Sequence, residues 1–278
     1  VWLSHEEIPG AADAVERLRA SGRRVLFVTN NSVATLADQE AALAAVGIPA
    51  TGDVVTSAQA AAALVGPDET VLVCGGPGVV EAVTVAGANV VRASAPSATG
   101  ADAVVVGLDR EFRFETLSVT SRAVRQGARF VATNDDPTFP TPGGATPGAG
   151  SFVAAVATAA GHTPVIAGKP HRPMAELVAA TCGPAFAAGN ALVVGDRWST
   201  VGAFAETIGC PFALVRSGVT PHGVAPGGAV DVDANDLAEV ADLLVDVRSP
   251  RFPTAVGWRV WKHPRSRSSS TPACSSPT

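Results

Sequence analysis

The chain of 278 residues has little of what marks several large protein classes. It contains four cysteines, and none of them forms a Cys-x-x-Cys pair, so neither a zinc site nor a disulfide scaffold is indicated. No apolar run is long enough to cross a membrane, and no basic segment followed by an apolar one opens the chain. We therefore expect a cytoplasmic protein that has no membrane partner.

Basic residues are also few, and lysine is the scarcest of them. The net charge is −5 at pH 7, so nothing in the overall charge points to nucleic acid. Lys169 and Lys262 are the only lysines. A lysine kept in a chain that otherwise uses arginine is a candidate for a task specific to an ammonium group.

What the chain does contain is a regular alternation of apolar strands and amphipathic helices, with 47% hydrophobic residues. Residues 24–28, 54–56 and 71–74 predict strands buried on both faces, and residues 36–46 predict a helix between two of them. This order predicts an α/β fold with a Rossmann-like, doubly wound parallel sheet.

The spacing of the elements restarts near residue 77, which predicts an inserted domain. We expect a core from residues 1–76 and 165–248, and an inserted α/β cap from residues 77–164 with its own small sheet. One continuous large sheet is the alternative. Pro137 to Gly150 is rich in proline and glycine, and we expect no regular structure there.

Residues 249–278 differ in composition from the rest of the chain. They contain no acidic residue, several arginines, and runs of serine and proline, so we expect a disordered tail. A contact with an anionic partner and out-of-frame sequence are the alternatives for this tail.

Polar groups follow three of the predicted strands. Thr29, Asn30 and Asn31 follow the first strand, Lys169 follows residues 165–166, and Asp196 follows the apolar run 191–195. The carboxyl ends of parallel strands meet at one edge, where ligands bind. A hydroxyl, main-chain N–H groups and a lysine suit a phosphate, and a carboxylate suits Mg²⁺. Each signal has a structural alternative: a cap on the next helix for Asn31 or Ser32, and a simple turn for Gly-Asp.

The order of these motifs resembles the haloacid dehalogenase superfamily, in the group with a large α/β cap that includes NagD-type, p-nitrophenyl, phosphoglycolate and pyridoxal-phosphate phosphatases. The resemblance spans residues 1 to about 245. It is carried by Ile8-Pro9-Gly10-Ala11, Phe27-Val28-Thr29-Asn30-Asn31-Ser32, Thr133-Asn134-Asp135, Pro147-Gly148-Ala149-Gly150-Ser151, Gly168-Lys169-Pro170 and Val194-Gly195-Asp196-Arg197.

The resemblance implies a Mg²⁺-dependent phosphatase that acts on a small phosphorylated metabolite. Thr29 matches the hydroxyl that binds the phosphoryl group, with Asn30 and Asn31 beside it. Lys169 matches the lysine that steadies nucleophile and phosphate, and Asp196 matches a Mg²⁺ ligand. Asn134 and Asp135 fall in the cap, which selects the substrate in this family and also forms homodimers in some members.

Two features of the sequence depart from the family pattern. The family attacks phosphorus with an aspartate and uses a second one as general acid/base, both in an Asp-x-Asp-Gly motif. That motif is expected just before Val1-Trp2-Leu3, and Asp231-Val232-Asp233 lies in a predicted late loop. Val201 stands where the family has a further acid.

Three hypotheses follow. The first is a phosphatase whose nucleophile motif lies upstream of this sequence, so that the 278 residues alone are inactive. The second is a catalytically inactive phosphate-binding or interaction protein on the same fold. The third is a degenerate gene product that expresses poorly.

Overall fold

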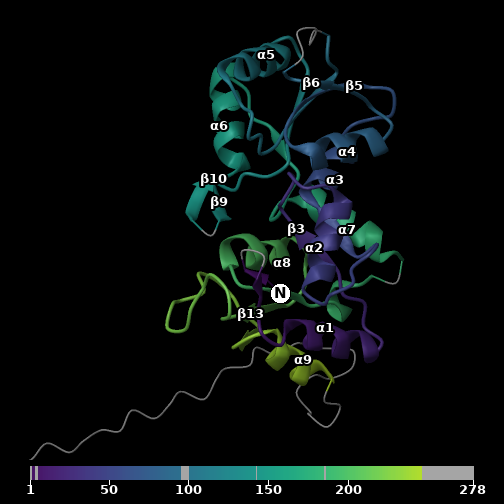
Figure 1. The fold of residues 1–278 in the computed structure, drawn as a ribbon, viewed down its shortest axis with the longest axis vertical. Coiled ribbons are helices and arrows are strands. Elements are labelled where there is room, and N and C mark those ends of the chain that lie inside the picture. The colour runs from purple at the N-terminus through teal and green to yellow at the C-terminus, as the bar shows by residue number, and fades with distance from the viewer. Residues whose placement is uncertain (1, 4–5, 95–99, 142, 185, 246–278) are drawn as a thin grey trace, which may run out of the picture.

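The computed structural model describes residues 2–3, 6–94, 100–141, 143–184 and 186–245, which form an elongated molecule with two bodies (Figure 1). The upper body in Figure 1 is built on a five-stranded parallel sheet, and the lower body holds two smaller parallel sheets. The predicted α/β class with a parallel sheet is confirmed.

The upper body has the strand order β11-β8-β7-β5-β6, and every neighbouring pair is parallel. Two helices, α5 and α6, pack on one face, and α3 and α4 pack on the other. The bounds of these elements are α3 Ser57–Ala62, β5 Thr70–Cys74, α4 Pro77–Val85, β6 Asn89–Arg92, β7 Ala103–Val106, α5 Phe114–Arg125, β8 Arg129–Ala132, α6 Ala149–Ala160 and β11 Val165–Ile166.

This sheet extends beyond the predicted insertion of residues 77–164. Its β5 and β11 lie outside that range, and Leu72 of β5 pairs with Val91 and Val104. The sequence analysis placed residues 71–74 with the earlier strands, because a strand buried on both faces carries no mark of the sheet it joins. The domain boundary itself stays a prediction.

The lower body contains the sheets β3–β4 and β12–β13–β14, both parallel. Among the described residues no strand pairing joins β3 to β12, but Val28 and Val193 belong to one hydrophobic cluster with Phe204. The elements here are α1 Ala11–Ala20, β3 Phe27–Thr29, α2 Leu36–Ala45, β4 Val54–Thr56, α7 Arg172–Cys182, the 3-10 turn Ala188–Asn190, β12 Val193–Gly195, α8 Ala203–Ile208, β13 Phe212–Val215, β14 Val232–Ala234 and α9 Leu237–Val245.

Several local predictions were wrong. The segment from Pro137 to Gly150 forms a hairpin from β9 (Thr138–Thr141) and β10 (Gly144–Pro147). A two-stranded ribbon tolerates proline because each strand has a free edge. Residues 231–233 belong partly to β14 rather than to a loop, because Val232 pairs with Ala213.

Two further elements lie near the N-terminus and after β12. Trp2–Leu3 (β1) pairs antiparallel with Glu6–Glu7 (β2). A π turn, Trp198–Gly202, follows β12 and continues as α8. Val1 and the whole of 249–278 lie outside the described residues.

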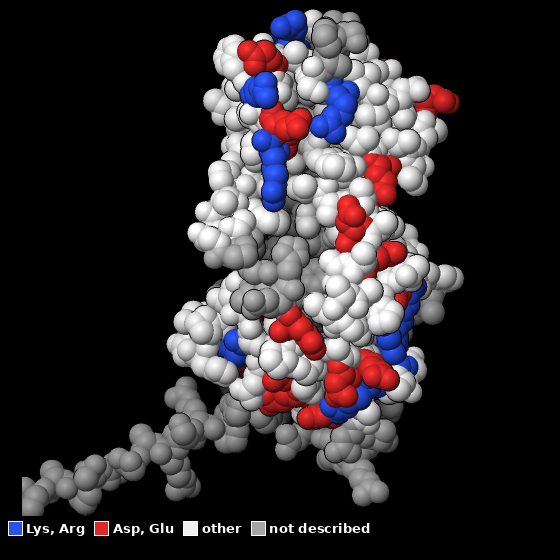
Figure 2. All heavy atoms as spheres, viewed as in Figure 1, with Lys and Arg blue, Asp and Glu red and all other residues white. Residues whose placement is uncertain are grey.

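The visible surface carries charges of both signs. In Figure 2 acidic side chains gather on the lower body, and some basic ones lie beside them. This face therefore offers no uniformly basic groove of the kind that nucleic acid needs. Among the described residues, no helix combines the length and hydropathy that crossing a bilayer requires.

Candidate active site

The turn after β3 is held together by its own polar side chains. Thr29 Oγ1 accepts a hydrogen bond from the Asn31 N–H at 3.0 Å, and Asn31 Oδ1 accepts one from the Val33 N–H at 3.0 Å. Helix α2 is capped by Thr35, so the alternative in which Asn31 or Ser32 caps the next helix is wrong. Thr29 thus stands at the end of a parallel strand, where the sequence placed it.

Lys169 reaches the same strand end. Its Nζ donates a hydrogen bond to the Val28 carbonyl oxygen at 2.7 Å. Burial of the ammonium group lowers the pKa of Lys169 from 10.5 to about 8, while the carboxylates of Asp136 and Asp196 oppose that shift. The structure therefore brings together the polar residues that follow β3, β11 and β12.

Asn30 lies between the strand end and the lysine segment. Its Oδ1 accepts from the Lys169 N–H at 2.8 Å, and its Nδ2 donates to the Lys169 carbonyl at 3.0 Å and to Asp136 Oδ2 at 2.9 Å. Its main-chain carbonyl accepts from Ser57 Oγ and from Asn134 Nδ2, each at 2.8 Å. One asparagine thus connects the loop after β3, the loop after β8 and the lysine segment.

The approach of these loops leaves no room for a side chain at Gly168. A Cβ added there would lie 2.6 Å from the Thr133 carbonyl oxygen and 2.7 Å from Asn30 Oδ1. Such distances are well below van der Waals contact, so only glycine fits between the two loops without moving them.

Asn134 and Asp135 lie at this junction, and they make different contacts. Asn134 is buried, donates to Asn30 as described, and accepts from the Asp136 N–H at 3.2 Å. The Asp135 carboxylate pairs with His171 Nε2 at 3.0 Å, at the start of α7. Their predicted role in selecting substrate stays a prediction.

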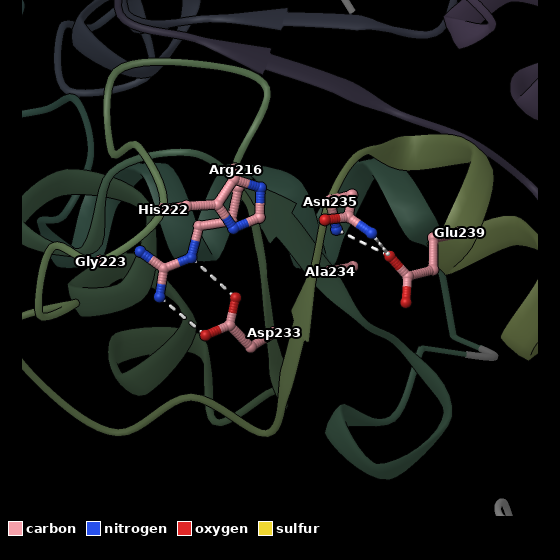
Figure 3. A pocket seen from close by; sticks show the side chains of 7 residues that line it. All are labelled: Arg216, His222, Gly223, Asp233, Ala234, Asn235 and Glu239. Carbon is pink, nitrogen blue, oxygen red and sulfur yellow. Dashed lines mark hydrogen bonds and ion pairs between the residues drawn. The ribbon is translucent and has the colours of Figure 1, made fainter. Parts of the chain in front are cut away.

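Asp196 follows β12 and is covered by the loop after β13. Its Oδ2 accepts from the Val219 N–H at 2.9 Å, and a Cβ on Gly218 would lie 2.0 Å from the same oxygen. Arg216 holds this loop: its side chain forms two hydrogen bonds with the Asp233 carboxylate and donates to the carbonyls of residues 221 and 224. Figure 3 shows this pair in a pocket that His222, Asn235 and Glu239 also line.

Val201 occupies an apolar environment. It packs with Trp198, Ala205 and Leu214, and its Cγ1 would lie 2.6 Å from a Cβ on Gly195. The side chain offers no oxygen to a metal or to Lys169, in agreement with the departure noted in the sequence.

The Asp196 carboxylate is a donor of the kind that suits a magnesium ion. Magnesium is commonly held by one or two carboxylates, substrate phosphate and water, and Asp196 supplies one carboxylate at the correct edge of the sheet. Among the described residues, no group of three or more His, Cys, Asp or Glu side chains gathers around a common point.

Sequence reasoning missed Asp136 and Arg216. The Asn30–Asp136 hydrogen bond joins residues 106 positions apart, and no spacing rule connects them. The adjacent Asn134-Asp135 pair was the only available signal. Arg216 carries no motif, and its role appears only once β13 and β14 are seen to pair.

Comparison with known proteins identifies the family. The profile of the haloacid dehalogenase-like hydrolases matches residues 1–89, and a second profile, described as HAD-hydrolase-like, matches residues 166–242. A D-glycerol 3-phosphate phosphatase of Mycobacterium tuberculosis is 39% identical over 227 residues, which are 79% of this chain and 61% of that protein. The chain therefore spans less than two thirds of the length of that relative.

Other relatives are covered more fully. The 5'-nucleotidase YutF of Bacillus subtilis is 34% identical over 77% of this chain and 82% of its own length. The structure of a p-nitrophenyl phosphatase from Archaeoglobus fulgidus has a TM-score of 0.81 and 27% identity, covering 87% of this chain and 95% of that one. A Mycobacterium tuberculosis glycerol phosphate phosphatase in complex with magnesium has a TM-score of 0.77 and 34% identity, covering 92% and 79%.

Two of these relatives are named phosphatases and one a 5'-nucleotidase. The chain belongs to the haloacid dehalogenase-like hydrolases, in the group related to the p-nitrophenyl phosphatases.

Proposed function

We propose that this protein is a Mg²⁺-dependent phosphatase that hydrolyses a small phosphorylated metabolite. The observation that carries the proposal is the position of the Lys169 ammonium group. Lys169 Nζ lies 2.7 Å from the carbonyl oxygen of Val28, the residue that precedes Thr29. The ammonium group also interacts electrostatically with Asp196. A cation, a hydroxyl and a carboxylate then meet at the edge where α/β proteins bind ligands.

Each of these groups has a task that follows from its chemistry. Lys169 binds a phosphate oxygen and offsets its charge, while the Thr29 hydroxyl and the main-chain N–H group of Asn30 supply hydrogen-bond donors. Asp196 would hold Mg²⁺ through the oxygen that does not accept from Val219. The metal, when bound, offsets the negative charge of the phosphoryl group.

The covalent step needs an attacking group other than Thr29, Lys169 and Asp196. In the expected reaction an aspartate forms a bond to phosphorus as the ester oxygen leaves, and water then cleaves the aspartyl-phosphate. We assign neither that aspartate nor its acid/base partner to any residue of this sequence.

The test compares the chain of residues 1–278 with a form that is longer at its N-terminus. Mass spectrometry of the N-terminal peptide of the native protein determines which residues, if any, precede Val1. We expect the printed chain to show no Mg²⁺-dependent hydrolysis of p-nitrophenyl phosphate, and a form that includes a strand ending in Asp-x-Asp-Gly to hydrolyse it. In that form Lys169→Ala and Asp196→Ala should each lower kcat/KM by about 100-fold or more, and Lys262→Ala should not.

Two results would contradict the proposal. A folded longer form without phosphatase activity would leave a phosphate-binding protein, which the phosphatase names of the relatives do not favour. Hydrolysis by the printed chain that Lys169→Ala abolishes would mean that a different group attacks phosphorus.

Substrate, assembly and location complete the proposal. Glycerol phosphate, phosphoglycolate and pyridoxal phosphate are the compounds to assay first. We also propose that the protein is cytoplasmic and that it forms a homodimer through the inserted segment of residues 77–164. Analytical ultracentrifugation of the chain and of surface variants in that segment tests the dimer.

A further inference from the structure

The contacts of Asn30 involve an acidic residue that the proposed function does not use. Asp136 lies in the loop after β8, before the β9–β10 hairpin, and its carboxylate accepts a hydrogen bond from Asn30 Nδ2 at 2.9 Å. Asp136 is only partly exposed, and its N–H donates to Asn134 Oδ1 at 3.2 Å. One hydrogen bond therefore holds the carboxylate and another holds the main chain of Asp136, beside the lysine segment.

The Asn30 amide can adopt two orientations that differ by exchange of its oxygen and nitrogen. In the observed one Oδ1 faces the Lys169 N–H and Nδ2 faces the Lys169 carbonyl, so both main-chain groups of Lys169 are paired. The opposite orientation would set an oxygen against the Lys169 carbonyl and an N–H group against the Lys169 N–H. A carboxylate only accepts hydrogen bonds, so Asp136 favours the same orientation as the main chain of Lys169 does.

We propose that Asp136 is a positioning residue of the candidate active site, which acts through the Asn30 amide to fix the main chain of Lys169. The inference rests on the proposed function in one respect, the use of Lys169 to bind phosphate. It adds that the loop leading into the β9–β10 hairpin helps to set where that lysine stands.

The same carboxylate also contributes charge. Two acidic groups act on the Lys169 ammonium, Asp136 from the loop after β8 and Asp196 from the end of β12, and Asp136 has the larger effect. Asp136 thus has two effects on Lys169: it helps to orient the main chain, and it favours the charged form of the ammonium group.

Nuclear magnetic resonance tests both effects without substrate or turnover. In a Lys262→Arg background Lys169 is the only lysine, so one labelled side-chain signal reports its pKa and one amide reports its hydrogen exchange. In Asp136→Ala we expect exchange of the Lys169 amide to become about tenfold faster, as the loss of a charged hydrogen bond implies, and the pKa of Lys169 to fall below about 8.

Three further variants make the result specific. Asp135→Asn is the matched control, because this neighbouring carboxylate pairs with His171, and it should leave the pKa of Lys169 where it is. Asp136→Asn, which is nearly isosteric, should lower the pKa as well and replaces Asp136→Ala if the latter does not fold. The double variant of Asn30→Ala and Asp136→Ala should exchange no faster at Lys169 than Asn30→Ala alone.

The proposal is overturned if the folded Asp136 variants leave either readout unchanged, or if the two substitutions accelerate exchange additively. Failure of the proposed function is a separate result. A longer form without hydrolysis would remove the phosphatase and leave the measured coupling between Asp136 and Lys169 intact.

Discussion

The two bodies of this molecule are built on the same kind of parallel strand but bury it to different degrees. In the upper body Leu72 and Val104 are fully buried in the interior of the five-stranded sheet. In the lower body every residue of β3 and β12 is only half-buried. The central strands of the upper sheet form a packed support, whereas β3 and β12 carry polar groups at their ends.

The comparison teaches where stability and chemistry are located. Apolar burial provides most of the free energy of folding, and the upper sheet has more of it per residue. The ends of β3, β11 and β12 instead place Thr29, Lys169 and Asp196 together. We therefore expect this part of the molecule to tolerate substitutions of its apolar side chains better than substitutions of these three polar residues.

The largest effect that can break this comparison comes from truncating matched leucines. Leu72→Ala empties a fully buried position, so we expect the free energy of unfolding to fall by about 2–5 kcal/mol. Leu192→Ala removes a half-buried side chain next to β12, and we expect a loss of about 1–2 kcal/mol. Urea unfolding measures both, and equal losses would show that the two bodies are equally well packed.

The second prediction concerns the loss of folding stability caused by burial of the Lys169 ammonium group beside β3. The unfolded chain holds its proton up to a pKa of 10.5, and the folded chain releases it at about 8. Between these pH values the unfolded state binds more protons, so the free energy of unfolding should rise with pH, by about 3 kcal/mol at most. Lys169→Met should lose this rise, and Lys262→Met should keep it.

The same titration affects ligand binding. Phosphate binding at Lys169 should weaken as pH rises through about 8, because the neutral amine no longer attracts an anion. A stability that is independent of pH between 8 and 10.5 in the unmodified chain would mean that Lys169 is not buried as described.

The smallest effect is expected at the loop that covers Asp196. Arg216→Lys removes the paired hydrogen bonds to Asp233, and we expect a loss of about 1 kcal/mol and faster exchange of the Val219 amide. Arg17→Lys is the control, since its pair with Asp242 is exposed and contributes little. If both variants behave alike, Arg216 does not hold the loop.

Much of the fold follows from local patterns in the sequence. Strongly apolar runs that end in polar residues located β3 and β12. Periodicity does not reveal which strands become neighbours. Residues 71–74 were therefore placed with the wrong set of strands, and the proline-rich segment after Asp136 was taken as irregular although it pairs with itself.

The site was predictable where side chains follow strands and unpredictable where loops meet. Thr29, Lys169 and Asp196 each end a recognisable apolar run, so topology alone brings them to one edge. The orientation of Asn30, the acceptance of its hydrogen bond by Asp136 and the ion pair of Asp135 with His171 depend on how distant loops pack. These contacts carry no signature in the sequence.

The absence of a side chain at position 168 has a consequence for protein engineering. Gly168 sets the spacing between the loop after β3 and the loop after β8. In a library that varies this position, we expect most variants to be unfolded or to have displaced loops. The strand β10, whose four residues are all exposed, is the opposite case. Diversity directed to that hairpin and withheld from Gly168 should preserve the lysine geometry while it explores new specificities.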